Sequence, residues 1–454
     1  MLNQRPWLEY PMNSGALLKT VTLGCKVNQY ETEYLRQGLL QVGYQDAGPD
    51  DPVDLCVVNT CTVTNEGDSK SRQAIRKLNR QHPEARIVVM GCYATRAPKE
   101  ILALPGVDEV ILDKRELPDW LGRFGVLDPP TGISAFGSRQ RAYIKVQDGC
   151  LLKCSYCIIP TVRPHMHSRP PEHILDEARR LIASGRREIV LTGIHLGHYG
   201  VDRNQGKPKS EWTRLSHLLQ EIVELPGRFR VRLSSIEATE ATPELIEVMA
   251  ANPTRICPHL HVCLQSGSDR VLQRMKRRWG ARRFLDCCAR IRRSLDNPAF
   301  TTDVMVGFPG ETEEDFQQTL AACEEVGFSK MHVFPFSIRK GTPAAEMDEQ
   351  LPGPIKKERS QRLMELGEKL RLRYFQGLLG STLEVLVEGP DESRRGWGKG
   401  TSCRYAPCSV PASDDQTGEL ISFQATEVVD GVLQGAPLAS ASAASSFVSG
   451  WKNG

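Results

Sequence analysis

The chain has 454 residues, enough for two or three domains with sizeable cores. Its net charge of +3 is too small to indicate nucleic-acid binding by itself, so evidence for such binding must come from local clusters of charge. Its 14 cysteines do not indicate a secreted disulfide scaffold, because residues 1–20 lack a charged start followed by an apolar run. No apolar stretch approaches the roughly 20 residues of a membrane span. We therefore expect a soluble cytoplasmic protein whose cysteines bind metal.

Residues 1–17 are expected to form a loose extension, and three β-α units are expected after it. Short β-branched runs occupy residues 19–23, 55–58 and 86–90. Apolar residues at helical spacing follow each run, over residues 31–40, 70–80 and 98–104. This alternation predicts a parallel α/β domain over residues 18–138.

Each of these three strands leads to a cysteine, namely Cys25, Cys61 and Cys92. Because ligands collect at the carboxyl edge of a parallel sheet, the topology brings the three thiols together as a cluster site. The alternative is three buried core cysteines. Gly24 and Gly91, which precede two of them, are turn residues and favour the cluster site. Cys56, inside a strand, is expected to be a core thiol.

A loop over residues 148–160 contains a second set of cysteines in the spacing C-x3-C-x2-C, at Cys150, Cys154 and Cys157. Three thiolates on a short loop can ligate three irons of a [4Fe-4S] cluster and leave the fourth iron open. The alternatives are a structural zinc loop or three unrelated thiols. Zinc normally requires four ligands in paired C-x2-C units, and only one such pair occurs here.

The proline and glycine residues around position 130 mark a boundary, and a second β-α series is expected over residues 139–378. The predicted strands are residues 142–146, 188–191, 229–233, 259–264, 302–306 and 332–336. The predicted helices are residues 172–183, 215–224, 243–249, 282–293, 313–326 and 355–372. Six β/α units predict a partial TIM-type barrel with its chemistry at the carboxyl ends of the strands.

Residues 379–436 show short alternating runs broken by glycines and polar turns. The runs are residues 383–387, 408–410, 420–423 and 427–433. This pattern predicts a small β-barrel or sheet. Residues 437–454 form an Ala/Ser-rich tail that is too polar to cross a membrane.

Over nearly the whole chain the motifs resemble the methylthiotransferase family of radical S-adenosylmethionine (SAM) enzymes. That family has an amino-terminal domain with an auxiliary [4Fe-4S] cluster, a central radical SAM barrel and a carboxy-terminal TRAM domain. The resemblance implies that Cys25, Cys61 and Cys92 hold the auxiliary cluster, which delivers sulfur. It also implies that the cluster of the 148–160 loop binds and reductively cleaves SAM.

The family resemblance extends to residues expected to contact SAM. Tyr156 would border the adenine. The other expected contacts lie at two strand ends, and they are Thr192, Gly193, Ser234, Ser235 and Glu237. Small and polar residues at a barrel mouth are suited to admit a polar ligand. Residues 303–312 also match the family, although an ordinary β-α turn explains them equally well.

Residues 23–32, Leu-Gly-Cys-Lys-Val-Asn-Gln-Tyr-Glu-Thr, look like the family branch that acts on threonylcarbamoyl-adenosine at position 37 of tRNA. The implied reaction replaces the C2 hydrogen with a methylthio group. Implied partners are the tRNA anticodon stem-loop, a reductant protein and a sulfur donor. The alternatives are isopentenyl-adenosine, a ribosomal-protein aspartate, or a non-catalytic iron-sulfur RNA-binding protein. The sequence after Cys25 argues against the first two, and the open-iron loop argues against the last.

Three arginines are expected at the barrel mouth to meet the anionic nucleotide, with Arg339 preferred over Arg163 and Arg169. A further basic segment could contact phosphates or be a solvated helix face. Its members are Arg270, Arg274, Lys276, Arg277, Arg278, Arg282, Arg283, Arg290, Arg292 and Arg293. His261 and Cys263 are expected to pack inside the barrel without a catalytic role.

Overall fold

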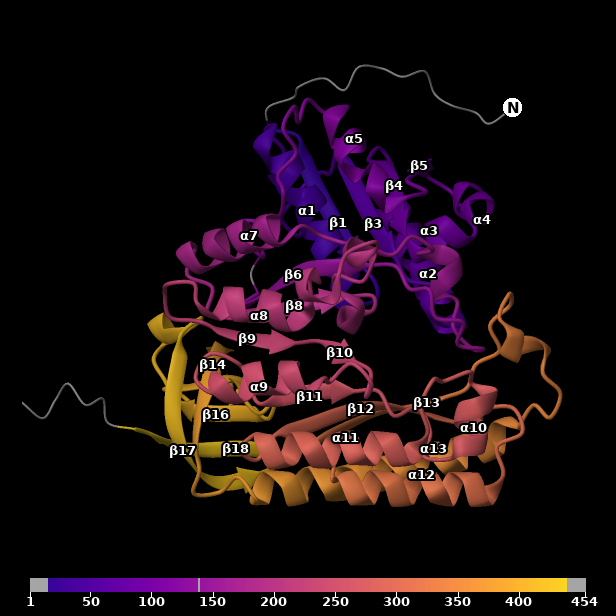
Figure 1. Cartoon of the computed structure of the whole chain (residues 1–454). Helices are drawn as coiled ribbons and strands as arrows, with labels where there is room; N and C mark the ends of the chain where they lie inside the picture. Colours follow the sequence, from indigo (N-terminus) through magenta and orange to yellow (C-terminus); the bar gives the residue numbers. More distant parts are fainter. Residues whose placement is uncertain (1–14, 138, 439–454) are drawn as a thin grey trace, which may run out of the picture.

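The computed structural model describes residues 15–137 and 139–438, which form an amino-terminal sheet domain, a central open barrel and a small β-barrel (Figure 1). Most of the expected extension, residues 1–14, lies outside the described residues. Its last residue, Leu17, already belongs to β1. Nearly all of the expected tail lies outside the described residues too. None of the helices in the described part of the chain is long and apolar enough to span a membrane.

The amino-terminal domain is a five-stranded parallel sheet in the order β2-β1-β3-β4-β5. The three predicted strands are β1 (Leu17–Thr22), β3 (Leu55–Thr60) and β4 (Arg86–Gly91). The sequence analysis missed the edge strands β2 (Gln45–Asp46) and β5 (Val107–Val110). Both are short and lack a buried apolar run, so hydrophobic pattern alone does not reveal them.

Helices cover both faces of this sheet, which explains why every residue of β3 and all but the first residue of β4 are buried. The helices are α1 (Lys26–Gln41), α2 (Asn65–Gln81), α3 (Cys92–Arg96), α4 (Pro98–Leu102) and α5 (Leu117–Gly122). The helix predicted at residues 98–104 is α4, whereas α3 was not predicted. The two helices are separated at Ala97, because a residue before proline disfavours helical backbone. Cys56 is completely buried in the sheet core, as predicted.

The central domain contains the six predicted parallel strands as an open barrel. They are β6 (Arg141–Asp148), β8 (Glu188–Gly193), β9 (Arg230–Leu233), β11 (His259–Val262), β12 (Ala299–Val306) and β13 (Lys330–Pro335). Two two-residue strands extend them, β7 (His167–Ser168) and β10 (Ser235–Ile236), giving the sheets β7-β6-β8-β9 and β10-β11-β12-β13. Within the described residues β6 and β13 do not pair, so the barrel is open on that side.

Six helices cover the outside of the open barrel, and each matches a predicted one. They are α7 (Pro171–Ala183), α8 (Leu215–Val223), α9 (Pro243–Ala251), α11 (Ala281–Ser294), α12 (Glu313–Val326) and α13 (Gly353–Gln376). The short helices α6 (Ile159–Val162) and α10 (Asp269–Arg274) were not predicted. A capping box between Thr312 and Asp315 starts α12, so residues 303–312 do form a β-α turn.

The carboxy-terminal domain is a closed five-stranded barrel in the order β14-β15-β16-β18-β17, drawn in yellow in Figure 1. The strands are β14 (Thr382–Pro390), β15 (Trp397–Ser402), β16 (Pro407–Pro411), β17 (Leu420–Val429) and β18 (Val432–Pro437). The single run expected at residues 427–433 is wrong. Asp430 and Gly431 both have positive φ and form a hairpin turn between β17 and β18.

Candidate active site

The loop after β6 carries the set Cys150, Cys154 and Cys157. Burial raises the pKa of Cys157 to about 12, and the charges of Cys154 and Cys150 contribute to the rise. Hydrogen bonds anchor the loop: the Cys150 N–H donates to the Arg163 carbonyl at 3.2 Å, and the Ser155 N–H donates to the Met275 carbonyl at 3.0 Å. The loop therefore presents three sulfurs from one fixed segment.

A buried histidine and a buried arginine face two of these thiols. His195 Nδ1 lies 3.6 Å from Cys150 Sγ, and Arg277 Nη1 lies 3.6 Å from Cys154 Sγ. The sequence analysis assigned no role to His195. It lies in the turn directly after β8, at the carboxyl edge of the barrel strands, and that position is the signal that could have identified it.

The set Cys25, Cys61 and Cys92 lies at the carboxyl edge of the amino-terminal sheet, as predicted. Cys25 is the N-cap of α1, Cys61 follows β3, and Cys92 starts α3 directly after β4. Burial raises the pKa of Cys61, and the charges of Cys92 and Cys25 raise it further. A Cβ added at Gly24 would lie 3.0 Å from the Cys61 Cβ, so the first two turns approach closely. Parallel topology therefore collects three thiols that are far apart in sequence.

Arg163 joins the two cysteine edges. Its side chain bonds the carboxylates of Glu31 at 2.7 Å and Asp148 at 2.8 Å, and its Nε lies 3.4 Å from Cys92 Sγ. Although burial opposes ionisation, Arg163 and then Lys145 lower the pKa of Glu31 to about 2. This ion network connects α1 of the amino-terminal domain with the cysteine loop of the barrel.

Each of the three arginines expected at the barrel mouth is paired with a carboxylate. Arg163 is 4% exposed and fully paired. Arg169 bonds Glu177 at 2.6 Å, and Arg339 bonds Asp68 at 2.7 Å. Buried guanidinium groups require such carboxylate partners, which sequence spacing cannot reveal. Whether any of the three also contacts a substrate stays a prediction.

The residues predicted to contact SAM lie in the cysteine loop, at the end of β8, and in or beside β10. Tyr156 packs against the apolar cluster of α10 and β12. Thr192 is buried near the end of β8, Gly193 ends that strand, and Ser235 begins β10. The side chain of Glu237 is 10% exposed, and its carboxylate pairs with Arg277 at 2.9 Å.

Two buried polar atoms in this region have no hydrogen-bond partner among the described residues, and they suit a polar ligand. These atoms are Ser234 Oγ and Gln265 Oε1, from residues that are 8% and 7% exposed. Gln265 also has a φ of 64°, in the left-handed region. Buried polar groups normally find partners, so these two atoms fit a site that binds a polar molecule such as SAM.

Polar side chains also line the barrel interior at β11, β12 and β13. His261 Nδ1 lies 3.0 Å from Thr301 Oγ1, as expected for a hydrogen-bonded interior residue. Burial opposes ionisation of Asp303, but His261, and then His332 and Lys26, lower its pKa. Lys26 belongs to α1, so the charge of an amino-terminal residue acts on the barrel.

The basic segment is partly paired within the protein and partly exposed, and its exposed members include Lys276, Arg278, Arg283 and Arg293. Several of its side chains bond the barrel itself: Arg274 pairs with Glu349 at 3.0 Å, Arg277 with Glu237, and Arg290 with the Ala241 carbonyl at 2.9 Å. Arg282 pairs with Asp286 within α11 while its side chain stays 82% exposed. Much of this charge stabilises the packing of α10 and α11.

The donor set fits an iron-sulfur cluster in each position. Each site offers three thiols together with a cationic hydrogen-bond donor to sulfur, and the barrel site adds partnerless polar atoms for a ligand. A loop of three cysteines after the first strand of an open β/α barrel defines a radical SAM enzyme. The radical SAM superfamily matches residues 144–323, and a second family, described as uncharacterized protein family UPF0004, matches residues 18–113.

Curated relatives identify the family within that class. Threonylcarbamoyladenosine tRNA methylthiotransferase MtaB of Bacillus subtilis is 39% identical, over 89% of this chain and 92% of that protein. MtaB of Thermotoga maritima is 38% identical, over 82% and 87%. The tRNA-2-methylthio-N(6)-dimethylallyladenosine synthase of Chloroflexus aurantiacus is 36% identical, over 92% and 90%. The chain belongs to the radical SAM methylthiotransferase family, whose members are transferases that use SAM and [4Fe-4S] clusters.

A solved structure shares the fold. The radical SAM methyltransferase TsrM from Kitasatospora setae superposes with a TM-score of 0.52 at 15% identity, covering 73% of this chain and 75% of that chain. At this identity the likeness shows a shared fold over that part of the two chains.

Proposed function

We propose that this protein converts threonylcarbamoyl-adenosine at position 37 of tRNA to its 2-methylthio derivative. The observation that carries the proposal is the juxtaposition of two three-cysteine edges, one on each domain, joined through Arg163. The identity to relatives named for this activity supports the choice of substrate. The relative named for dimethylallyladenosine is the neighbouring alternative.

The two cysteine sets would have different roles. Cys150, Cys154 and Cys157 would hold the cluster that binds SAM, and the other three would hold the auxiliary cluster associated with sulfur delivery. When bound, the SAM cluster supplies the one-electron chemistry that removes hydrogen from an unactivated carbon. The chain itself fixes the sulfurs, excludes water with the amino-terminal domain and orients the nucleotide.

The substrate carries a carboxylate, which requires a cation or hydrogen-bond donors in its pocket. Because the three predicted arginines are already paired, we assign this role first to Lys26. Its side chain has no ion pair among residues 15–137 and 139–438, and its charge acts on Asp303 and His332 of the barrel. Lys26 also follows Cys25 directly, which would bring the substrate close to the auxiliary cluster.

A cavity of about 770 Å³ beside β13 is a suitable place for the RNA strand. It lies on the open side of the barrel, and its lining includes Lys330, Arg371 and Tyr405. Cations and aromatic rings are the usual contacts for unpaired nucleotides. The remaining partners would be a reductant protein and a sulfur donor of the cytoplasm.

The test uses anaerobically reconstituted protein and two tRNAs, one with threonylcarbamoyl-adenosine and one with isopentenyl-adenosine. Nucleoside mass spectrometry should find the methylthio product only with the first tRNA. Lys26→Gln should raise KM for this tRNA about tenfold, as expected for the loss of a charge-assisted hydrogen bond, while Lys26→Arg retains most activity. Lys340→Gln, at an exposed site, is the control. Equal activity on both tRNAs would assign the chain to the neighbouring branch.

A further inference from the structure

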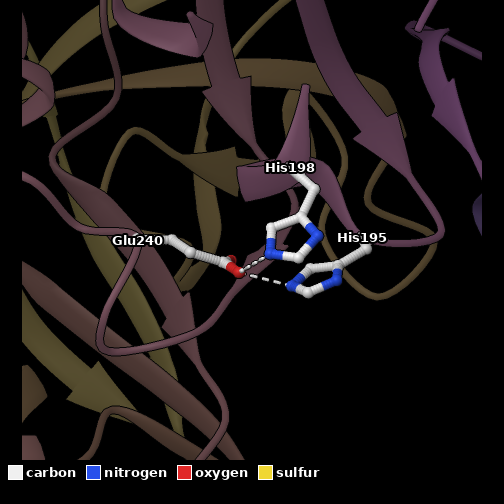
Figure 2. Close-up of side chains that lie close together, drawn as sticks. All are labelled: His195, His198 and Glu240. Carbon is white, nitrogen blue, oxygen red and sulfur yellow. Dashed lines mark hydrogen bonds and ion pairs between the residues drawn. The ribbon is translucent and has the colours of Figure 1, made fainter. Parts of the chain in front are cut away.

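A buried carboxylate and a buried imidazole connect the barrel interior to one cysteine of the 148–160 loop. His195 bonds Glu240 through Nε2, as Figure 2 shows. Its Nδ1 lies 3.6 Å from Cys150 Sγ. His195 is 6% exposed, and the Glu240 side chain is 7% exposed. Since each ring nitrogen has an acceptor, a doubly protonated ring satisfies both, and the Glu240 carboxylate balances its charge.

The surrounding backbone fixes this arrangement. Glu240 Oε2 accepts a hydrogen bond from the Glu237 N–H at 3.0 Å, and the His195 N–H donates to Gln147 Oε1 at 2.7 Å. A Cβ added at Gly197 would lie 2.1 Å from Glu240 Oε2, so only glycine lets the 3₁₀ turn η2 (Leu196–His198) approach the carboxylate. The ring orientation is therefore determined before any ligand binds.

A second pair repeats the same pattern. Arg277 Nη1 lies 3.6 Å from Cys154 Sγ and 2.9 Å from a Glu237 carboxylate oxygen. Two of the three loop thiols thus face a cation held by a carboxylate, and both carboxylates belong to the segment that follows β10. Such repetition is the arrangement expected around a group that gains negative charge.

His195, His198 and Glu240 could also form a site for a separate metal ion. The geometry disfavours that alternative. Arg278 Nη2 lies 3.2 Å from His198 Nε2, so a divalent cation would be placed beside a guanidinium group. The remaining nitrogen of His195 is directed at Cys150 instead.

We propose that His195, positioned by Glu240, donates a hydrogen bond to the Cys150 thiolate and raises the reduction potential of the cluster held there. The reduced cluster carries one more negative charge than the oxidised cluster, so donors and positive charge at its sulfurs stabilise the reduced form. Arg277, held by Glu237, has the same effect at Cys154. This inference rests on the assignment of a cluster to the loop under the proposed function.

The experiment isolates the barrel cluster and measures its redox equilibrium. In protein with Cys25, Cys61 and Cys92 replaced by alanine, an electron paramagnetic resonance titration follows the one remaining cluster. His195→Leu and Glu240→Gln should each retain about four irons. The ratio of reduced to oxidised cluster at a fixed potential should fall about tenfold, as expected for the loss of one charge-assisted hydrogen bond.

Control variants distinguish an effect on the reduction potential from misfolding and from a wrong assignment of the cluster. His195→Gln keeps a donor without the charge, so its ratio should lie between those of the unsubstituted protein and His195→Leu. His217→Leu, at an exposed position of α8, should leave the ratio unchanged. Full iron with an unchanged ratio in both test variants would overturn the inference, and so would loss of iron from both. If the reference protein, with only Cys25, Cys61 and Cys92 replaced, held no cluster, the proposed function would be overturned instead.

Discussion

Single arginines connect the domains of this enzyme. Arg163 links the barrel loop to Glu31 and lies beside Cys92, and Arg339 links the loop after β13 to α2 through Asp68. Removal of one partner from such a buried pair leaves the other charge without compensation, which costs more than an exposed pair contributes. The distance between the two cysteine edges therefore depends on the ion pairs of a few side chains.

Arg339→Ala should lose most turnover while retaining both clusters, because Asp68 still bonds Arg96 but the loop after β13 loses its anchor. The expected loss in free energy of unfolding is about 2 kcal/mol, typical of hydrogen bonds to a charged group. Product formation and iron content measure the two effects. Lys340→Ala, the exposed neighbour, serves as the control. Full turnover by Arg339→Ala would show that this anchor is dispensable.

At the scale of secondary-structure elements, the turns that carry the cysteines are the most constrained parts of the amino-terminal sheet. Gly91, the last residue of β4 and the residue directly before Cys92, has a φ of 100°. A Cβ at this position would lie 2.4 Å from the Thr60 carbonyl oxygen. Glycine is required here both for the backbone angle and for the close approach of β3.

Gly91→Ala should therefore displace Cys92 and remove the auxiliary cluster while the barrel cluster remains. Iron in the reconstituted protein is expected to fall from about eight atoms to about four. Gly185→Ala is a matched control, because Gly185 has a φ of 87° but no atom within 4 Å of the added Cβ. Iron determination and 5′-deoxyadenosine formation measure the outcome. If Gly91→Ala bound as much iron as the control, the close approach would not be essential for the cluster site.

At the scale of the whole molecule, the small β-barrel is attached to the amino-terminal ends of the central strands. Arg230 and Arg232 hold Glu188 at 2.6 and 2.8 Å, and they also donate to backbone carbonyls of β14 and β15. The carboxyl ends of the same strands carry the active site. The two ends of the central barrel therefore have different roles. The amino-terminal ends of its strands hold the small β-barrel, and the carboxyl ends carry the active site.

Glu188 should make this attachment sensitive to acid. Burial opposes its charged form, but Arg232 and Arg230 hold its pKa well below the usual 4.5. Because the folded pKa is depressed, the stabilisation is complete above a pH of about 4.5 and is lost as the pH falls below it. Glu188→Gln should lower the free energy of unfolding by about 3 to 5 kcal/mol at pH 7, with a smaller difference in acid.

Urea unfolding of the cluster-free protein at neutral and acidic pH measures that difference. Glu244→Gln is the control, because its pair with Arg214 is half-exposed and should contribute less than about 1 kcal/mol. A difference that is independent of pH would contradict the assignment of the stabilisation to the ionised carboxylate.

The sequence by itself determined the order of elements and the two cysteine sets. Hydrophobic periodicity is local, so it predicted the six barrel strands, the three strands that lead to cysteines and the helices between them. The C-x3-C-x2-C spacing is also local, and parallel topology extended the argument to Cys25, Cys61 and Cys92. The edge strands, the β17–β18 hairpin and β15 were missed, because short or glycine-rich strands carry a weak pattern.

Only the tertiary structure decided what the charged residues do. Arg163, Arg169 and Arg339 looked like open cations in the sequence, and the fold supplied Glu31, Glu177 and Asp68 as their partners. His195 and Glu240 gave no motif, because their contact with Cys150 joins three separate loops at one barrel edge. An ion pair or hydrogen bond depends on positions within about 4 Å, and such proximity between distant segments exists only after the chain has folded.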